Sequence, residues 1–430
     1  NCTRLASISL PPGLTDIGDG AFFNCRALAR VSIPDSVTTI RDGAFFGTAL
    51  TSISIPSGVA EIGAFVFARC PALEAIHVEP GNQHFSTIDG VLFSADKYTL
   101  IRCPEGRAGD YAVPQKVSAL GGSSCSWWCY SVGGAFENCD RLASIQLPDG
   151  LTSIGARTFR GCSALASLTI PGQVSEIDAS AFDACPALTA IDVAPDNADF
   201  SAVDGLLING EGTELVRCPE SRTGHLEVPA RVTTLGALSF ADCDALTSIA
   251  IPEGVTAIQK SVFAGCGELQ SIQLPASLVE LGGAVFSSCP RLSDIEVAGG
   301  NPNYRSIEGA VYDRAGDELL LCPPGRTGVF TIANGVTAIA SNAFASCQQL
   351  SGIVIPASVQ TFDSRWALSG CTSLESIKVA EESADFASAA GVLYDREMTS
   401  LLFCPRAKAG TYTVAHGVQS VAWAAFQRCV

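Results

Sequence analysis

The chain repeats one 23-residue pattern, C-x-x-L-x-x-I-x-I-P-x-x-V-x-x-I-x-x-x-A-F-x-x, from its first residues to its last. Leu142, Leu165 and Leu188 follow one another at this spacing. A fixed period with apolar residues at set positions is typical of stacked turns, each of which buries its apolar face against its neighbours. The sequence therefore predicts a solenoid, which needs no closed core, and we expect residues 1–430 to form one repeat domain.

Each regular unit has three parts. In one early copy, Val31 and Ile33 alternate with polar residues, which predicts a short strand that Pro34 ends. Residues 37–40 carry the V-x-x-I pattern and return along the far side, and Phe45 marks the corner where the chain turns back. Phenylalanines recur at this corner, and Leu368 takes their place once: Phe22, Phe45, Phe67, Phe136, Phe159, Phe182, Phe240, Phe263, Phe286, Phe344 and Phe426.

Four longer elements interrupt the regular copies, near residues 79–114, 194–229, 298–332 and 380–414. In each, an apolar run follows a glycine, and a polar turn leads to a second apolar run that ends in Cys-Pro. Two such runs joined by a short turn predict a β-hairpin. Asp89-Gly90 becomes Glu308-Gly309 and Ala390-Gly391 in later copies, which fits a turn but not a calcium ligand. We expect about 12 regular turns and 4 hairpin-bearing turns.

Composition excludes several classes of function. The net charge of −17 argues against nucleic acid and against an anionic membrane surface as partners. No stretch approaches 18 uninterrupted apolar residues, so we expect no membrane insertion. The chain opens in mid-repeat at Asn1 and stops one step into another copy, so we interpret it as a piece of a longer protein. The absence of a targeting signal then carries little weight.

The cysteines divide into three groups, one of which ends the four longer elements and is also expected to be buried: Cys103, Cys218, Cys322 and Cys404. Most occupy the repeat corner, beside the phenylalanines, and no C-x-x-C pair suggests zinc, so buried thiols without metal or cofactor are expected. These are Cys2, Cys25, Cys70, Cys139, Cys162, Cys185, Cys243, Cys266, Cys289, Cys347, Cys371 and Cys429. Cys125 and Cys129 lie outside the repeat phase, in an insertion at 123–133. A local disulfide, which requires a non-reducing compartment, and two free thiols both remain open for this pair.

The same insertion holds Trp127, Trp128 and Tyr130. Loops that interrupt a repeat tend to carry function, and Trp and Tyr are favoured anchors of interfaces. One hypothesis is therefore that these three side chains bind a ligand. The alternative is that they fold onto the flank of the solenoid and cover apolar surface.

A second candidate site is a set of polar residues on the predicted strands. His77, Asp192, Glu296 and Lys378 occupy the outward position of the I-x-I pattern, each in the turn before a hairpin. They form either a contact site or a solvated edge where the stack is interrupted. The histidines vary between copies and no catalytic motif appears, so we expect no enzyme.

The 23-residue period, the I-x-I-P strand end, the A-F-x-x-C-x-x-L corner and the D-G-V-L-F element together resemble the BspA-like (Treponema pallidum-type) leucine-rich repeat family. The resemblance covers nearly the whole chain. It implies a right-handed, α/β-class superhelix of short parallel strands with little helix. It also implies a cell-surface or secreted bacterial protein, some relatives of which adhere to host matrix proteins. The family has no shared catalytic residues.

Together, these observations predict a non-enzymatic recognition or adhesion module. Its ligand would be a protein or glycan, host extracellular matrix being one candidate, held by many shallow contacts over the concave face. The alternative is a structural stalk that displays another domain.

Overall fold

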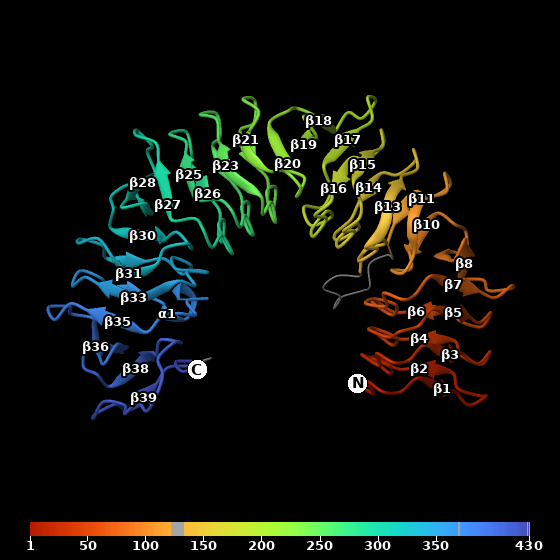
Figure 1. Ribbon diagram of the computed structural model, residues 1–430, viewed down its shortest axis with the longest axis horizontal. Coiled ribbons are helices and arrows are strands. Elements are labelled where there is room, and N and C mark those ends of the chain that lie inside the picture. The colour runs from red at the N-terminus through yellow and green to blue at the C-terminus, as the bar shows by residue number, and fades with distance from the viewer. Residues whose placement is uncertain (122–132, 369, 428, 430) are drawn as a thin grey trace. The chain divides into compact units, whose positions relative to one another are not determined.

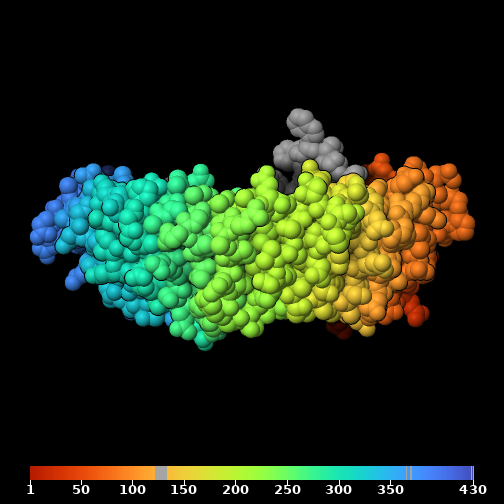
Figure 2. Space-filling model, turned by 90° about the horizontal axis from the view of Figure 1, so that it is seen from above, coloured from red at the N-terminus to blue at the C-terminus, as the bar shows by residue number. Residues whose placement is uncertain are grey.

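A computed structural model describes residues 1–121, 133–368, 370–427 and 429, and shows a β-solenoid of about 17 turns with almost no helix (Figure 1). The chain divides into two compact units. Unit 1 comprises Asn1–Gly212 and Val216–Ser221, and unit 2 comprises Thr213–Leu215 and Arg222–Val430. Within each unit, successive turns lie side by side in chain order across the surface (Figure 2). That residues 1–430 fold as one domain stays a prediction.

One side of each turn carries a strand formed by the I-x-I pattern. In β5 (Ser52–Ile55), Ile53 and Ile55 are buried while the serines face solvent, as the alternation predicted. Neighbouring strands pair in parallel and in phase with the repeat: Ile53 lies opposite Ile76. The other strands of this side, which we call the long strands, are β1 (Ser7–Ser9), β3 (Arg30–Ser32), β7 (Ala75–Val78), β11 (Ala108–Ala112), β13 (Arg141–Gln146), β15 (Ser167–Ile170), β17 (Ala190–Val193), β21 (Gly224–Glu227), β23 (Leu246–Ala250), β25 (Ser271–Leu274), β27 (Asp294–Val297), β31 (Gly328–Thr331), β33 (Leu350–Ile355) and β35 (Ser376–Val379).

The V-x-x-I pattern forms the return segment on the other side, as predicted. Each copy ends in a two-residue strand, and Ile17 lies opposite Ile40, again one repeat apart. These short strands are β2 (Asp16–Ile17), β4 (Thr39–Ile40), β6 (Glu61–Ile62), β12 (Ala119–Leu120), β14 (Ser153–Ile154), β16 (Glu176–Ile177), β22 (Thr234–Leu235), β24 (Ala257–Ile258), β26 (Glu280–Leu281), β32 (Ala338–Ile339), β34 (Thr361–Phe362) and β39 (Ser420–Val421).

Each of the four longer elements contains three consecutive strands. The predicted hairpin is present in the first as β9 and β10, but β8 precedes and pairs with β9, so the element is one strand larger than expected. The third strand then joins the short strands: β10 pairs in parallel with β12. The strands are β8 (Phe85–Ile88), β9 (Val91–Ser94), β10 (Thr99–Arg102), β18 (Phe200–Val203), β19 (Leu206–Asn209), β20 (Glu214–Arg217), β28 (Tyr304–Ile307), β29 (Ala310–Asp313), β30 (Glu318–Leu321), β36 (Phe386–Ala389), β37 (Val392–Asp395) and β38 (Ser400–Phe403).

Two local devices fix the start of this element. Asp89 (φ 50°) and Gly90 (φ 78°) join β8 to β9 with left-handed backbone at both positions, the geometry of a tight hairpin turn. The turn role predicted for Asp-Gly is thus confirmed. Just before β8, the Asn82 carboxamide donates to the carbonyls of Pro56 and Val59, at 2.9 Å each, and accepts from the backbone of Phe85 at 2.8 Å. Asn82 therefore ties the element to the preceding turn.

The corner residues form the core of the stack, except for Phe426 in the last turn, which is exposed. Phe240, Phe263 and Phe286 stack with ring centroids 5.3 Å apart, and all three are buried. Leu368 is also buried, in the copy that has one extra residue between Cys347 and Cys371. The short helix α1 (Ser364–Ala367) takes up that residue. No helix in the described part of the chain is long and apolar enough to cross a membrane.

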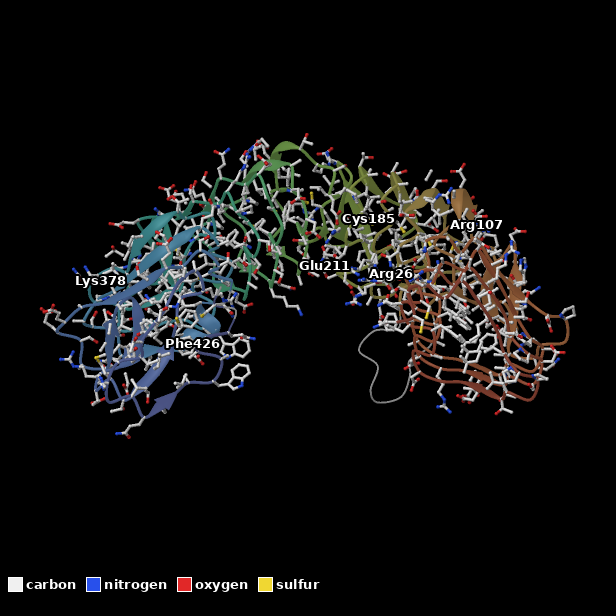
Figure 3. All side chains as sticks on the ribbon, turned by 60° about the horizontal axis from the view of Figure 1, so that its bottom comes forward. Arg26, Arg107, Cys185, Glu211, Lys378 and Phe426 are labelled. Atoms are coloured by element: carbon white, nitrogen blue, oxygen red, sulfur yellow. The ribbon has the colours of Figure 1, made fainter. Side chains whose placement is uncertain are left out.

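The corner cysteines lie in the core, with two exceptions. Cys185, labelled in Figure 3, is fully buried, and so are the other corner cysteines between Cys25 and Cys371. The prediction was wrong for Cys2, which is exposed, and for Cys429, which is half-buried. Both lie in turns that have a neighbour on one side only, so the stack does not enclose them.

Candidate functional site

The residues of the aromatic insertion lie outside the part of the chain that the structure describes. They include Trp127, Trp128 and Tyr130, and also Cys125 and Cys129. Their roles as ligand anchors and as a disulfide stay predictions.

The four polar residues of the predicted site are placed but not brought together. His77, Asp192, Glu296 and Lys378 are all exposed, each on the last long strand before a hairpin element. Their strands β7, β17, β27 and β35 pair with a preceding strand and not with one another. Figure 3 shows Lys378 at the long-strand edge of unit 2, opposite the corner edge that carries Phe426. Proteins often place charged residues on the edge strands of a sheet, and these four positions fit that pattern. A ligand contact at these positions stays a prediction.

A groove crosses the corner turns of unit 1. Its volume is about 570 Å³, within the range of ligand sites. Arginines line it, although the chain as a whole is acidic. Figure 3 shows Arg26 at this corner edge and Arg107 at the opposite, long-strand edge. We call this surface the corner groove and define it by Asn24, Arg26, Arg69, Glu105, Asn138 and Arg160.

Glu105, one member of a buried ion pair, lies on the floor of the corner groove. The first hairpin turn has Arg-Cys-Pro-Glu instead of the usual corner, and Arg102 contacts Glu105 at 2.5 Å with both side chains buried. The Glu105 carboxylate also accepts the backbone N–H of Arg69 at 2.8 Å. It thereby replaces the carbonyl that a regular turn would offer. Burial raises the pKa of Glu105 even though Arg102 opposes the shift.

The second hairpin turn repeats this pair, and the third and fourth do not. Arg217 contacts Glu220 at 2.8 Å in the second turn, and both are buried. Leu321 and Pro324 stand at these places in the third turn. A cavity of about 290 Å³ opens beside Leu321 and Pro324, against about 50 Å³ beside Arg102 at the same place in the first turn. Loss of the large ionic side chains therefore leaves space in the third turn.

The fourth hairpin turn carries an aromatic site that the sequence analysis missed. Trp366 (57% exposed) and Trp423 (73% exposed) line a cavity of about 260 Å³ together with Phe403, Arg406 and Gln427. We call it the aromatic cavity. A signal was present in the sequence, because Trp423 stands where earlier copies have Gly133 and Ser341. The regular apolar positions of the repeat predicted a buried core, and the tryptophans at these places were not predicted to form a site.

The buried thiols are unsuited to catalysis or metal binding. Burial raises the pKa of Cys185 and of Cys289 to about 12, so both stay protonated near neutral pH. Their S–H groups donate to backbone carbonyls of Phe159 and Phe263, one turn earlier, at 3.1 and 3.0 Å. Among the residues that the structure describes, no group of three or more His, Cys, Asp or Glu side chains is arranged to hold a metal ion.

Comparison with known proteins gives one family. The description "BspA type Leucine rich repeat region" matches in 6 copies, over residues 1–107, 133–201, 220–313 and 327–390. No curated protein matches the chain.

Among the solved structures that the chain resembles are three of bacterial proteins. A leucine-rich cell surface protein of Faecalibacterium prausnitzii is 24% identical, over 87% of this chain and 88% of that one, with a TM-score of 0.48. A leucine-rich repeat protein of Eubacterium ventriosum is 20% identical, over 90% and 82%, with a TM-score of 0.44. The pneumococcal vaccine antigen PcpA is 16% identical, over 87% and 74%, with a TM-score of 0.34.

Proposed function

Since this chain belongs to the BspA-type leucine-rich repeat family, we propose that it is a cell-surface or secreted recognition module that binds a glycan or protein ligand. Members of this repeat family are typically surface proteins used for protein interaction. Leucine-rich repeat folds are typically non-catalytic, which supports a binding role without chemistry.

The observation that carries this proposal is the aromatic cavity of unit 2. Trp366 and Trp423 expose more of their surface than any other aromatic side chain in the part of the chain that the structure describes. Indole rings give a large rigid contact area at low entropic cost, and they stack on sugar rings or receive apolar side chains equally well. Arg406 and Gln427 line the same cavity and add hydrogen-bond donors that fix orientation.

The test is a binding screen against immobilised glycans and extracellular matrix proteins. We expect Trp423→Ala to weaken binding about 30-fold or more, the loss typical of a truncated aromatic anchor. Phe23→Ala is the matched control, since Phe23 is an exposed aromatic of unit 1 (39% exposed). Loss only in Trp127→Ala/Trp128→Ala would move the site to the insertion. Absence of any binding by the unaltered chain would contradict the proposal and favour the stalk.

A further inference from the structure

We propose that the corner groove of unit 1 binds an extended acidic polysaccharide, with its carboxylate or sulfate groups on Arg26, Arg69 and Arg160. The inference deepens the recognition function but uses a different site from the aromatic cavity.

Local charge is the first argument. Among the described residues, Arg26 and Arg69 have no carboxylate within ion-pair distance, and Arg69 rests on the Phe46 ring at 5.7 Å. Arg160 pairs with Glu137 at 3.2 Å but keeps 43% of its side chain exposed. The one carboxylate that lines the groove, Glu105, is neutralised by Arg102. The groove is therefore a positive strip on a chain of net charge −17, and it selects an anion.

The same corner positions in unit 2 are not basic in any turn before the last, where Arg428 stands at the place of Asn24. Asp242 and Asp244 occupy the places that Asn24 and Arg26 hold in unit 1, and the next turn has Gly265 and Gly267 there. The repeat itself therefore does not require arginine at the corner. Three arginines along one groove are a departure from the pattern, and in unit 2 an arginine stands at these places only in the last turn, as Arg428.

Spacing excludes a compact anion. Arg26 and Arg69 are two turns apart, and Arg160 follows three turns later, counting the hairpin turn. At a strand spacing of about 4.8 Å, these steps are roughly 10 and 14 Å. A single phosphate or citrate-sized ion cannot reach all three guanidinium groups. An extended polymer with charges at saccharide intervals can, and arginine forks pair well with carboxylate and sulfate.

The groove floor favours a polysaccharide over an acidic peptide. An extended peptide gains affinity by pairing its backbone with unpaired N–H and C=O groups. Here the corner N–H groups are already used between turns: Asn24 donates to the carbonyl of Phe46 at 2.7 Å and Asn138 to that of Arg160 at 2.7 Å. The side-chain amide of Asn24 remains on the floor and suits a sugar hydroxyl, whereas Asn138 Nδ2 already donates to Glu105 at 3.5 Å.

The test compares four immobilised polymers: heparin (sulfated), polygalacturonate (carboxylated), neutral dextran and poly-glutamate. The unaltered chain should bind heparin, polygalacturonate or both, lose that binding as salt is added, and ignore dextran. Arg26→Glu/Arg69→Glu should weaken binding about 100-fold or more, which is about tenfold for each arginine whose charge is reversed. Arg30→Glu is the matched control, since Arg30 is exposed in the same turn on long strand β3. It should bind like the unaltered chain, and all variants should melt alike.

Four results would overturn the inference: no binding to either polysaccharide, equal loss in Arg30→Glu, full binding by Arg26→Glu/Arg69→Glu, or preference for poly-glutamate over both polysaccharides. The last result would assign the groove to an acidic peptide. Trp423→Ala separates this inference from the proposed function, because it leaves the corner groove intact: it should keep binding to heparin or polygalacturonate while it loses the ligand of the aromatic cavity.

Discussion

Individual residues in the corner turns have roles that the repeat pattern does not express. The sequence predicted buried cysteines, but not that Cys162 donates its S–H to the carbonyl of Phe136 at 3.2 Å. Thr48 replaces a cysteine in one turn and donates to the carbonyl of Phe45, within its own turn, at 2.9 Å. Glu105 in the same way replaces a missing acceptor. The period and the hydropathy of the sequence predict which residues are buried. They do not predict a hydrogen-bond partner in the neighbouring turn, because only the stacking of turns brings the two groups together.

The Glu105 carboxyl gives a pH-dependent prediction. Burial raises its pKa, so the folded chain holds this proton more tightly than the unfolded chain does. As the pH rises past the ordinary glutamate range, the unfolded state loses its proton first, and the free energy of unfolding falls. We therefore expect Glu105→Gln to lower the free energy of unfolding by well under the roughly 3–5 kcal/mol that breaking a buried ion pair costs. The cost should shrink as the pH rises.

Urea unfolding of the unaltered chain and of Glu105→Gln, between mildly acidic and neutral pH, measures this cost in the free energy of unfolding. Asp16→Asn is the control, because it breaks the exposed pair with Arg41 and should cost about 1 kcal/mol or less at every pH. A full ion-pair cost that grows with pH would show that attraction to Arg102 outweighs burial.

At the scale of elements, the hairpin turns were predictable in place but not in size. The second and third strands of each follow from apolar runs and a polar turn. The first strand was missed because its residues, such as Ser86 and Thr87 in β8, are polar and only half-buried. Its partner β9 supplies the pairing, and Asp89-Gly90 fixes the register. An edge strand of this kind is determined by its turn and its neighbour more than by its own hydropathy.

Gly90 tests that turn. A Cβ at Gly90 would lie 2.9 Å from the Cβ of Ala75 and would also force a side chain into φ +78°. Gly109 has φ +84° but open space around it, so Gly109→Ala isolates the backbone cost of about 1–2 kcal/mol. We expect Gly90→Ala to destabilise the protein by clearly more than Gly109→Ala in chemical unfolding. Equal losses would mean that β8 and β9 shift to accept the methyl group without cost.

At the scale of the whole molecule, stability is carried by contacts between neighbouring turns. Phe263 is fully buried between Phe240 and Phe286, and Phe263→Ala should cost about 3–5 kcal/mol. Because each turn contacts only its neighbours, hydrogen exchange should rise in the adjacent turns of unit 2 and stay unchanged in unit 1.

Exchange measured by mass spectrometry, with a thermal melt beside it, checks this prediction. Val279→Ala is the control, since Val279 is 52% exposed in the same unit, and it should change neither readout. No thermal shift in Phe263→Ala would contradict the burial. A rise in exchange throughout both units would instead support one cooperative domain over residues 1–430.

The sequence by itself determined the solenoid, its phase, the columns of buried residues and the position of the hairpin turns, because periodic burial repeats in the chain and can be counted. Only the tertiary structure shows at which corners a groove or a cavity forms. Arg26, Arg69 and Arg160 are distant in the chain and line one groove, and Trp366 and Trp423, on either side of the fourth hairpin turn, line one cavity. Such neighbours lie at irregular sequence separations, so only stacking brings their side chains to one surface.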